Sequence, residues 1–452
     1  MKAMCVVVVV LMSCGGGKKE MPPPAGPEAV VEQVDAAPEP VAEPSAEEVG
    51  AAWGERVERA FVAITTNSYV VSAARPTAAA AWAALDGVAA DLPADDAALA
   101  GALRQRAAVG VGSKQLPPER VWAAIEAMTA VADNAHVMLV DGPRMTQLGG
   151  SIEGAPFVTP GAMVHWTADA ELVVAEVLSG SPAASAGLVV GDVIVSVDGR
   201  APRRVAPLFD AMFLPAGTKK ALQIRRAGTD STVTVTLEPF LHPVEAHRLL
   251  KGGVGLIRLY FCAKGEAPER NHIALTRAAL AELDAKKATR VVIDLRGNMG
   301  GAGVAEWASI FTSADPILLA RWAGEPADEP WARKGDVWPK ARPIAVLVDE
   351  QTVSCGEMIA YALAEHGVAR LFGQPTGGAF HVPDGVDLGE GHILMVPVGE
   401  VLGPKTQKVP DGHKVWPQVE VPNRTVGELI TGKDPQLDAA LAWLAKQKAP
   451  KR

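Results

Sequence analysis

The sequence is poor in cysteine, in aromatic residues and in positive charge. Four cysteines occur in 452 residues, and none of them has the CxxC spacing of a zinc or redox motif. Aromatic residues make up 5% of the chain, and the formal net charge is -9. Binding to phosphate backbones needs clustered Lys and Arg, and no basic stripe is present. Nucleic acid is therefore not an expected partner, and nothing in the sequence implies a metal or an organic cofactor.

Long apolar runs are also lacking, apart from a short one at the N-terminus. Lys2 precedes the run AMCVVVVVLM, and small residues follow it. This order is typical of a secretory signal peptide, and the run is too short to span a bilayer of about 30 Å. Leu11-Met12-Ser13-Cys14 resembles a bacterial lipobox, which implies a signal peptide over 1–13 and a diacylglycerol on Cys14. The alternative is an ordinary cleaved signal with a chance cysteine.

The lipobox resemblance predicts an exported protein that is anchored in the cell envelope and faces the periplasm. Gly15 gives no inner-membrane retention signal of the Asp type, so the outer membrane is preferred. Residues 14–47 are rich in Pro, Ala and Glu, and such a segment buries too little apolar surface to offset its ordering entropy. We expect a disordered tether there.

Residues 48–150 have a helical pattern. The segments WGERVERAFVAI and PPERVWAAIEAMTAVA place apolar residues three and four positions apart. Pro117 and Pro118 stand where a helix would begin. The sequence therefore predicts an N-terminal helical region.

Residues 151–240 change to short β segments bounded by Gly, Asp or Pro. Within them, GSPAASAGLVVGDVIVSVDG runs from Gly180 to Gly199 and resembles the signature of a PDZ domain. That resemblance implies capture of an extended peptide at a sheet edge, with its terminal carboxylate held by backbone N–H groups. A small β domain with glycine turns is the alternative.

Residues 241–432 alternate between buried strands and helices. The strands GVGLIRLYF, RVVIDLRG and PIAVLVDE are each followed by a helical pattern. Such alternation predicts a mainly parallel sheet covered on both faces, and thus a multidomain α/β chain. Residues 433–452 are expected to form a closing helix and tail.

The PDZ pattern followed by an α/β region resembles the carboxy-terminal processing peptidases, also called tail-specific proteases. Two motifs carry the resemblance further: VIDLRGNMGG at 292–301 is similar to the family's DLRGNxGG, and DEQTVSCGEM at 349–358 is similar to its DExTASASE. The resemblance extends to about residue 423. It implies a crotonase-like or ClpP-like core and a serine-type endopeptidase that recognises protein tails through the PDZ domain.

The second motif aligns Ser354 with the family's nucleophile. A serine at a helix N-terminus is exposed and lies near the positive end of the helix dipole. The resemblance implies an oxyanion hole made by the amide of Cys355 and that of Gly300 or Gly301. Two alternatives remain at this point: Ser354 as a plain helix cap, and Cys355 as the nucleophile.

The serine needs a base, and the lysine that many family members use aligns here with Ala379. The segment VADNAHVML at 131–139 resembles the LxDxHxxL motif of the family's tricorn-like branch, which implies His136 as the base. An imidazole with a pKa of about 6.5 suits that role near neutral pH. His366 and His381 are rival bases.

In that branch a glutamate orients the histidine, and Asp411 takes its position here. Gln418 replaces the usual aspartate of the same segment. These departures leave a second hypothesis, a catalytically inactive PDZ-containing peptide-binding lipoprotein. A crotonase-type hydrolase or hydratase is a third. The sequence does not decide whether Cys262 and Cys355 form a disulfide.

Overall fold

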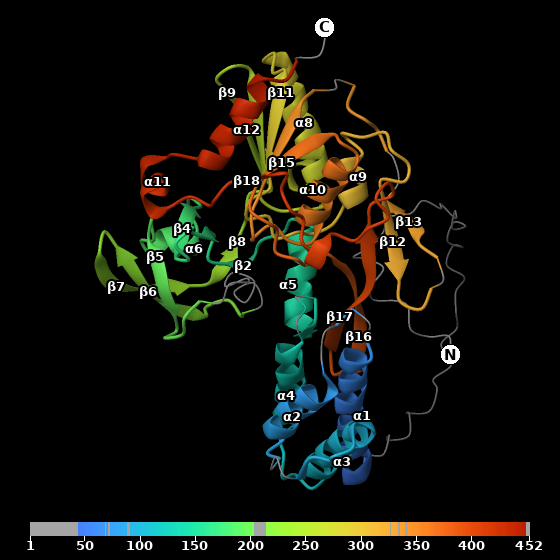
Figure 1. Cartoon of the computed structure of the whole chain (residues 1–452). Helices are drawn as coiled ribbons and strands as arrows, with labels where there is room; N and C mark the ends of the chain where they lie inside the picture. Colours follow the sequence, from blue (N-terminus) through green and yellow to red (C-terminus); the bar gives the residue numbers. More distant parts are fainter. Residues whose placement is uncertain are drawn as a thin grey trace, which may run out of the picture. The chain divides into compact units, whose positions relative to one another are not determined.

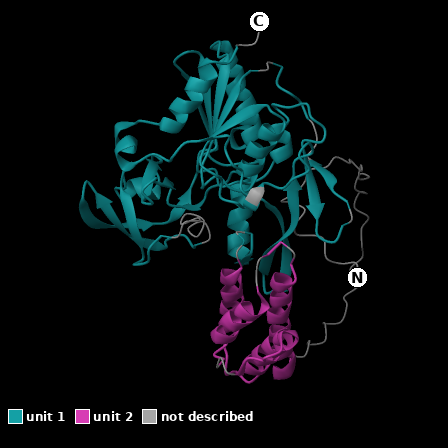
Figure 2. Cartoon of the chain, in the orientation of Figure 1, with its two compact units in different colours: residues 1–12, 134–452 teal, residues 13–133 magenta. Residues whose placement is uncertain are grey.

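The computed structural model describes residues 44–448 except 68, 71–72, 88–90, 133, 135, 203–213, 326, 333–334 and 340–341. The predicted signal peptide, Cys14 and the tether up to residue 43 lie outside the described residues. The chain divides into two compact units, residues 13–133 and residues 1–12 with 134–452 (Figure 2). Among the described helices, none combines the length and the apolar character needed to cross a bilayer.

The smaller unit is helical, as predicted. Its described helices are α1 (Ala46–Thr65), α2 (Ala74–Ala84), the short η2 (Asp96–Ala98), α3 (Leu99–Gly112) and α4 (Pro118–Val131). Ser45 and Glu48 form a capping box at the start of α1, so the helix begins at the end of the expected tether. Pro118 occupies the first turn of α4, where its missing N–H costs nothing.

An antiparallel five-stranded sheet occupies the expected PDZ region. Its strands pair in the order β3-β4-β5-β6-β7. The described elements here are β2 (Phe157–Thr159), β3 (Ala162–Trp166), β4 (Leu172–Val177), α6 (Pro182–Ser185), β5 (Val193–Val197), β6 (Lys219–Arg226), β7 (Thr229–Thr236) and β8 (Glu238–Phe240). Ser181 caps α6 by accepting from Ala184 N. β2 pairs with β8 beside this sheet.

The core contains a six-stranded sheet in the order β18-β15-β14-β11-β10-β9. All neighbouring pairs are parallel except β9 with β10, which is antiparallel. The strands are β9 (Glu245–Leu250), β10 (Val254–Leu259), β11 (Arg290–Asp294), β14 (Ile344–Val348), β15 (Ala369–Gly373) and β18 (Val419–Glu420). The prediction of a mainly parallel sheet is confirmed.

Helices cover both faces of this sheet (Figure 1). One apolar cluster joins alternate strand residues to α8 (His272–Ala285), α9 (Val304–Ala308) and α10 (Cys355–Glu365). The other strand residues pack against α12 (Pro435–Ala445). Side chains of a strand alternate between faces, so near-continuous apolar strands such as IAVLV serve both layers.

A second sheet was not anticipated from the sequence. It contains β1 (Met138–Val140), β12 (Leu318–Trp322), β13 (Glu329–Ala332), β16 (His381–Gly389) and β17 (His392–Leu402), with β17 pairing to β1, β12 and β16. Pro383 and Gly385 interrupt the strand pattern of β16, and its pairing with β17 shifts register after Val382. The short elements α5 (Gly142–Ile152), η3 (Pro268–Arg270), η4 (Asp411–His413) and α11 (Val426–Thr431) complete the described structure.

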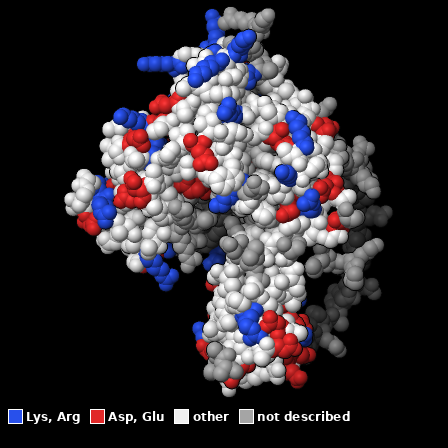
Figure 3. Space-filling model, viewed as in Figure 1, with Lys and Arg blue, Asp and Glu red and all other residues white. Residues whose placement is uncertain are grey.

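Charges of both signs are spread over the described surface. On the face drawn in Figure 3, basic and acidic side chains are interspersed, and no broad basic area is visible there. This distribution agrees with the formal net charge of -9.

Candidate active site

Ser354 lies in the sharp turn between β14 and α10. Its backbone has φ 52° and ψ -123°, a conformation that non-glycine residues rarely adopt. Its amide donates to Glu357 Oε2 at 2.9 Å, so Glu357, one turn into the helix, fixes the turn. A strained strand-to-helix turn is the arrangement that presents a nucleophilic hydroxyl above a sheet.

Glu357 connects this turn to the loop before β16. Its Oε1 accepts from Gly378 N at 2.8 Å and from the Thr376 hydroxyl. The carboxyl is fully buried, and burial raises its pKa to about 7, against the lowering effect of these donors. Glu357 therefore holds the loop before β16 against the Ser354 turn. This loop contains Ala379, which the sequence comparison aligned with the lysine of the resembled family.

The glycine-rich loop after β11 lies directly against Ser354. A Cβ added at Gly300 would come within 2.6 Å of Ser354 Cβ, so this position accepts only glycine. Gly300 N donates to Asn298 Oδ1 at 2.9 Å, and Asn298 O accepts from Val353 N at 2.9 Å. Within the described residues, the Gly301 amide has no hydrogen-bond partner, so of the two predicted donors Gly301 is the one left for a ligand.

His136 is buried just before β1. Strand pairing places it there, because Met138 of β1 lies opposite Met395 of β17. Burial, together with the nearby His381, lowers the pKa of His136 to about 4. Its Nδ1 has no hydrogen-bond partner among the described residues. The imidazole is thus neutral and has a nitrogen available.

His136 is the first of three neighbouring histidines, which come from the segment before β1, from β16 and from η4. His381 opens β16, and its ring lies 4.1 Å from that of His413, centroid to centroid. His413 Nε2 contacts Glu400 Oε1 at 3.1 Å. The β16–β17 register, which pairs His381 with Glu400, brings these groups together. The sequence analysis considered His381 only as a rival base and did not foresee His413 or Glu400.

The other predicted residues are placed as follows. Asp411 lies in η4, and its side chain is outside the described part of the structure. His366 caps the end of α10, and its Nε2 contacts Ile317 O at 2.7 Å, which gives it a structural role. Lys414, which sequence reasoning missed, packs its methylene chain over Gly378, where a Cβ would meet it at 3.1 Å.

No hydrogen bond connects Ser354 Oγ with His136 in the described structure. Catalytic hydrogen bonds are often long or misaligned before substrate binds, so the two remain candidates for one site. The arrangement as it stands supplies a strained serine, a free glycine amide beside it and a neutral buried histidine. These are the components of acyl transfer by a serine nucleophile.

The PDZ-region sheet is hydrogen-bonded to the segment that precedes Ser354. Trp166 N, at the end of β3, donates to Glu350 Oε1 at 3.0 Å. Asn423 Nδ2 donates to Glu350 Oε2 at 2.7 Å and to Trp166 O at 2.8 Å. Glu350 is four positions before Ser354, so β3 is held directly to the segment that leads into Ser354.

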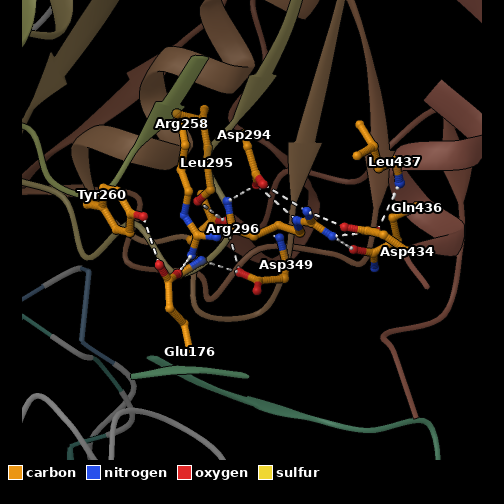
Figure 4. A network of polar contacts seen from close by, with 12 residues as sticks. Glu176, Arg258, Tyr260, Asp294, Leu295, Arg296, Asp349, Asp434, Gln436 and Leu437 are labelled. Atoms are coloured by element: carbon orange, nitrogen blue, oxygen red, sulfur yellow. Dashed lines mark hydrogen bonds and ion pairs between the residues drawn. The ribbon is translucent and has the colours of Figure 1, made fainter. Parts of the chain in front are cut away.

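Figure 4 shows two further groups of polar contacts, one between the same sheet and β10 and one at the start of the glycine-rich loop. Glu176 of β4 accepts from Tyr260 Oη at 2.9 Å and pairs with Arg258 at 3.0 Å. Arg296, which begins the loop, pairs with Asp294 at 2.7 Å and with Asp434 at 2.8 Å. Burial tends to raise the pKa of Asp294, but the Arg296 guanidinium holds it at about 2.

Comparison with known proteins agrees with these observations. The family model described as Peptidase family S41 matches residues 253–421, and a PDZ domain model matches residues 173–226. A carboxyl-terminal-processing protease of Picosynechococcus sp. is 29% identical over 73% of this chain and 80% of its own length. The corresponding protein of Synechocystis sp. is 28% identical, over 72% and 77%. The solved structure of a photosystem II D1 C-terminal processing protease has a TM-score of 0.54 at 20% identity, covering 88% of this chain and 98% of that one.

Proposed function

Since this chain belongs to the carboxyl-terminal processing peptidases of family S41, we propose that it cleaves protein substrates with Ser354 as nucleophile and His136 as general base. That the chain is a serine-type peptidase with a PDZ domain follows from its family. The positive φ of Ser354, beside a glycine whose added Cβ would collide with it, is the observation that supports this residue as the nucleophile.

In the proposed mechanism Ser354 Oγ attacks the scissile carbonyl carbon while His136 takes the hydroxyl proton. The carbonyl oxygen becomes an oxyanion and accepts from the amides of Gly301 and Cys355. His136 then delivers the proton to the leaving amine, and water releases the acyl group by the same steps in reverse order. Asp411 remains the predicted partner of His136 Nδ1, where it would stabilise the imidazolium.

The PDZ domain is the proposed entry point for substrate. A peptide added to the edge of its sheet would be held relative to the site by the contacts of Trp166 and Glu176 with the core. Protein or peptide binding of this kind agrees with the family. Recognition of a free C-terminus in particular is part of the proposal.

We further propose that Cys14 is lipidated and that the enzyme is anchored in the cell envelope, facing the periplasm. The support is the order of the N-terminal residues, a basic residue, an apolar core and then Leu11-Met12-Ser13-Cys14. Growth of cells with radiolabelled palmitate should label the native chain and leave Cys14→Ser unlabelled.

The catalytic proposal is tested by cleavage of an unfolded protein such as casein. Removal of the nucleophile or the base should lower kcat by about 10⁴-fold or more, because the two groups act as a unit. We therefore expect Ser354→Ala and His136→Ala to be similarly inactive, with unchanged folding by circular dichroism.

A matched variant separates this account from a serine–lysine dyad. Lys414→Met keeps the methylene chain over Gly378 and removes the ammonium group. We expect Lys414→Met to have near-normal activity. If Lys414→Met were inactive while His136→Ala stayed active, the base would be the lysine. Absence of casein cleavage by the unaltered chain, with retained binding of C-terminal peptides, would favour the inactive binding protein.

A further inference from the structure

Two cysteines and a histidine from three different segments of the chain meet behind the turn that carries Ser354. Cys262 follows β10, His272 begins α8 and Cys355 begins α10. The two Sγ atoms and a ring nitrogen of His272 all lie within 4.8 Å of one another. All three residues are buried, with exposed fractions of 0%, 0% and 1%. Both cysteines are thiols in this structure.

The hydrogen bonding of His272 determines which ring nitrogen faces the sulfurs. Nδ1 lies 2.6 Å from Ala263 O, and since a carbonyl only accepts, Nδ1 carries the proton. Nε2 is then an unprotonated lone pair, and it has no hydrogen-bond partner among the described residues. A buried polar atom in this condition is costly unless a ligand satisfies it.

This tautomer is the one that metal-bound histidines adopt. A histidine ligand typically donates its second N–H to a carbonyl or carboxylate, which fixes the ring and directs the other nitrogen to the ion. In tetrahedral zinc sites the Zn–S and Zn–N distances are about 2.3 and 2.1 Å. Ligand atoms within 4.8 Å of one another therefore need only a small inward movement to reach one ion.

We propose that Cys262, His272 and Cys355 bind a zinc ion behind the active-site turn. Each thiol loses its proton to solvent as its sulfur bonds to Zn²⁺, so two protons are released for each ion bound. Two thiolates and a divalent ion sum to zero charge, which a fully buried site tolerates. Three protein ligands leave the fourth tetrahedral position to water.

The ion would join the segments that form the proposed oxyanion hole. Cys262 N donates to Gly300 O at 2.8 Å, and Cys262 O accepts from Ala302 N at 2.9 Å. Cys355 follows Ser354 directly and its Sγ contacts Ala302 O at 3.6 Å. Zinc bound here therefore cross-links α8, α10 and the segment after β10, which is hydrogen-bonded to the glycine-rich loop. It should stabilise the site without taking part in peptide cleavage.

Cobalt substitution tests the site independently of activity. The purified chain is freed of metal with a chelator and titrated with Co²⁺. Binding should give the absorption of tetrahedral, thiolate-ligated cobalt at about one ion per chain, and zinc should displace it. Zinc should also raise the melting temperature in proportion to the logarithm of its concentration.

Variants assign the ligands. His272→Gln can still donate to Ala263 O but lacks the second ring nitrogen, so it should fold and lose the cobalt spectrum. Cys262→Ser should lose it also. His413→Gln is a control for metal binding elsewhere. In the described structure His381, Glu400 and His413 also bring possible ligand atoms together, but this group offers no sulfur and cannot give a thiolate–cobalt spectrum. Cys14→Ser controls for the N-terminal thiol. Both controls should keep the spectrum.

Three results would overturn the proposal. They are absence of the thiolate–cobalt spectrum in the unaltered chain, its persistence in both His272→Gln and Cys262→Ser, and peptide mapping of the native protein that shows Cys262 disulfide-bonded to Cys355.

Discussion

The positive φ of Ser354 is a backbone conformation that costs stability. A positive φ at a non-glycine residue costs about 1–3 kcal/mol, and it persists only where surrounding contacts impose it. Here Glu357 accepts from Ser354 N, and Asn298 accepts from Val353 N. The strain is therefore maintained by the buried Glu357 carboxylate on one side of the turn and by the backbone carbonyl of Asn298 on the other.

The pH dependence of cleavage should report the environment of His136. Burial lowers its pKa to about 4, so the imidazole stays unprotonated and able to accept a proton at pH values well below 6.5. We expect kcat/KM to fall on acidification only as the pH approaches the lowered pKa. An acid limb near pH 6.5, measured with a peptide substrate, would mean that the base is a solvated group.

The sequence predicted which residues are candidates for the active site better than it predicted which atoms those residues contact. Ser354 and the glycines are identified by motif, because their residue types and spacing are themselves the chemical requirement. Asn298 and Glu357 belong to the same motifs, but their role depends on which backbone amides they meet after folding. The metal-ligand group of Cys262, His272 and Cys355 has no local spacing signal, since its members come from three different elements.

The strands and helices that position the candidate site differ in how well they can be predicted from the sequence. Apolar runs predicted β10, β11 and β14 because these strands are buried on both faces. The sheet of β1, β16 and β17 escaped prediction, since β1 is only three residues long and β16 contains Pro383 and Gly385. That sheet brings His136 near His381. The predicted base could therefore be named from a motif, but its surroundings could not.

The packing of α1 against α3 in the smaller unit can be tested by substitution. α1 and α3 approach closely at Gly54, where an added Cβ would lie 2.5 Å from Arg104 O. Gly54→Ala should destabilise this unit by about 1–3 kcal/mol, because the helices must separate. Urea unfolding, followed by tryptophan fluorescence, to which Trp53, Trp82 and Trp122 of this unit contribute, measures the change.

Gly101 provides the matched control. It lies on α3 with nothing within 4 Å of an added Cβ. Gly101→Ala should stabilise the unit by about 0.5–1 kcal/mol through helix propensity alone. Equal effects of the two substitutions would contradict the close packing of α1 on α3.

For the whole molecule, lowering the pH should reduce the free energy of unfolding more in the larger unit than in the smaller one. Burial lowers the pKa to about 4 at four histidines of the larger unit, which are His136, His165, His272 and His381. Between pH 6.5 and 4 the unfolded chain binds protons that these folded residues do not, so the free energy of unfolding falls as pH falls. Glu357 and Asp349, whose pKa values are raised to about 7, have the opposite effect on the free energy of unfolding. These two carboxyl groups are fewer than the four histidines.

The smaller unit contains no histidine, so this source of acid sensitivity is absent from it. Hydrogen exchange at pH 7 and pH 5, corrected for intrinsic rates, should show protection falling in β10, β11 and β14 while α1 and α3 change little. Uniform loss of protection across both units would contradict the assignment of acid sensitivity to the buried histidines.

The catalytic assignment of Ser354 is tested most directly by mapping a covalent label. The chain is treated with a fluorophosphonate, digested and analysed by tandem mass spectrometry. The account predicts one adduct, on Ser354 Oγ, that is absent from Ser354→Ala and strongly slowed in His136→Ala. An adduct on Cys355 or on another serine, or unchanged labelling of His136→Ala, would contradict it.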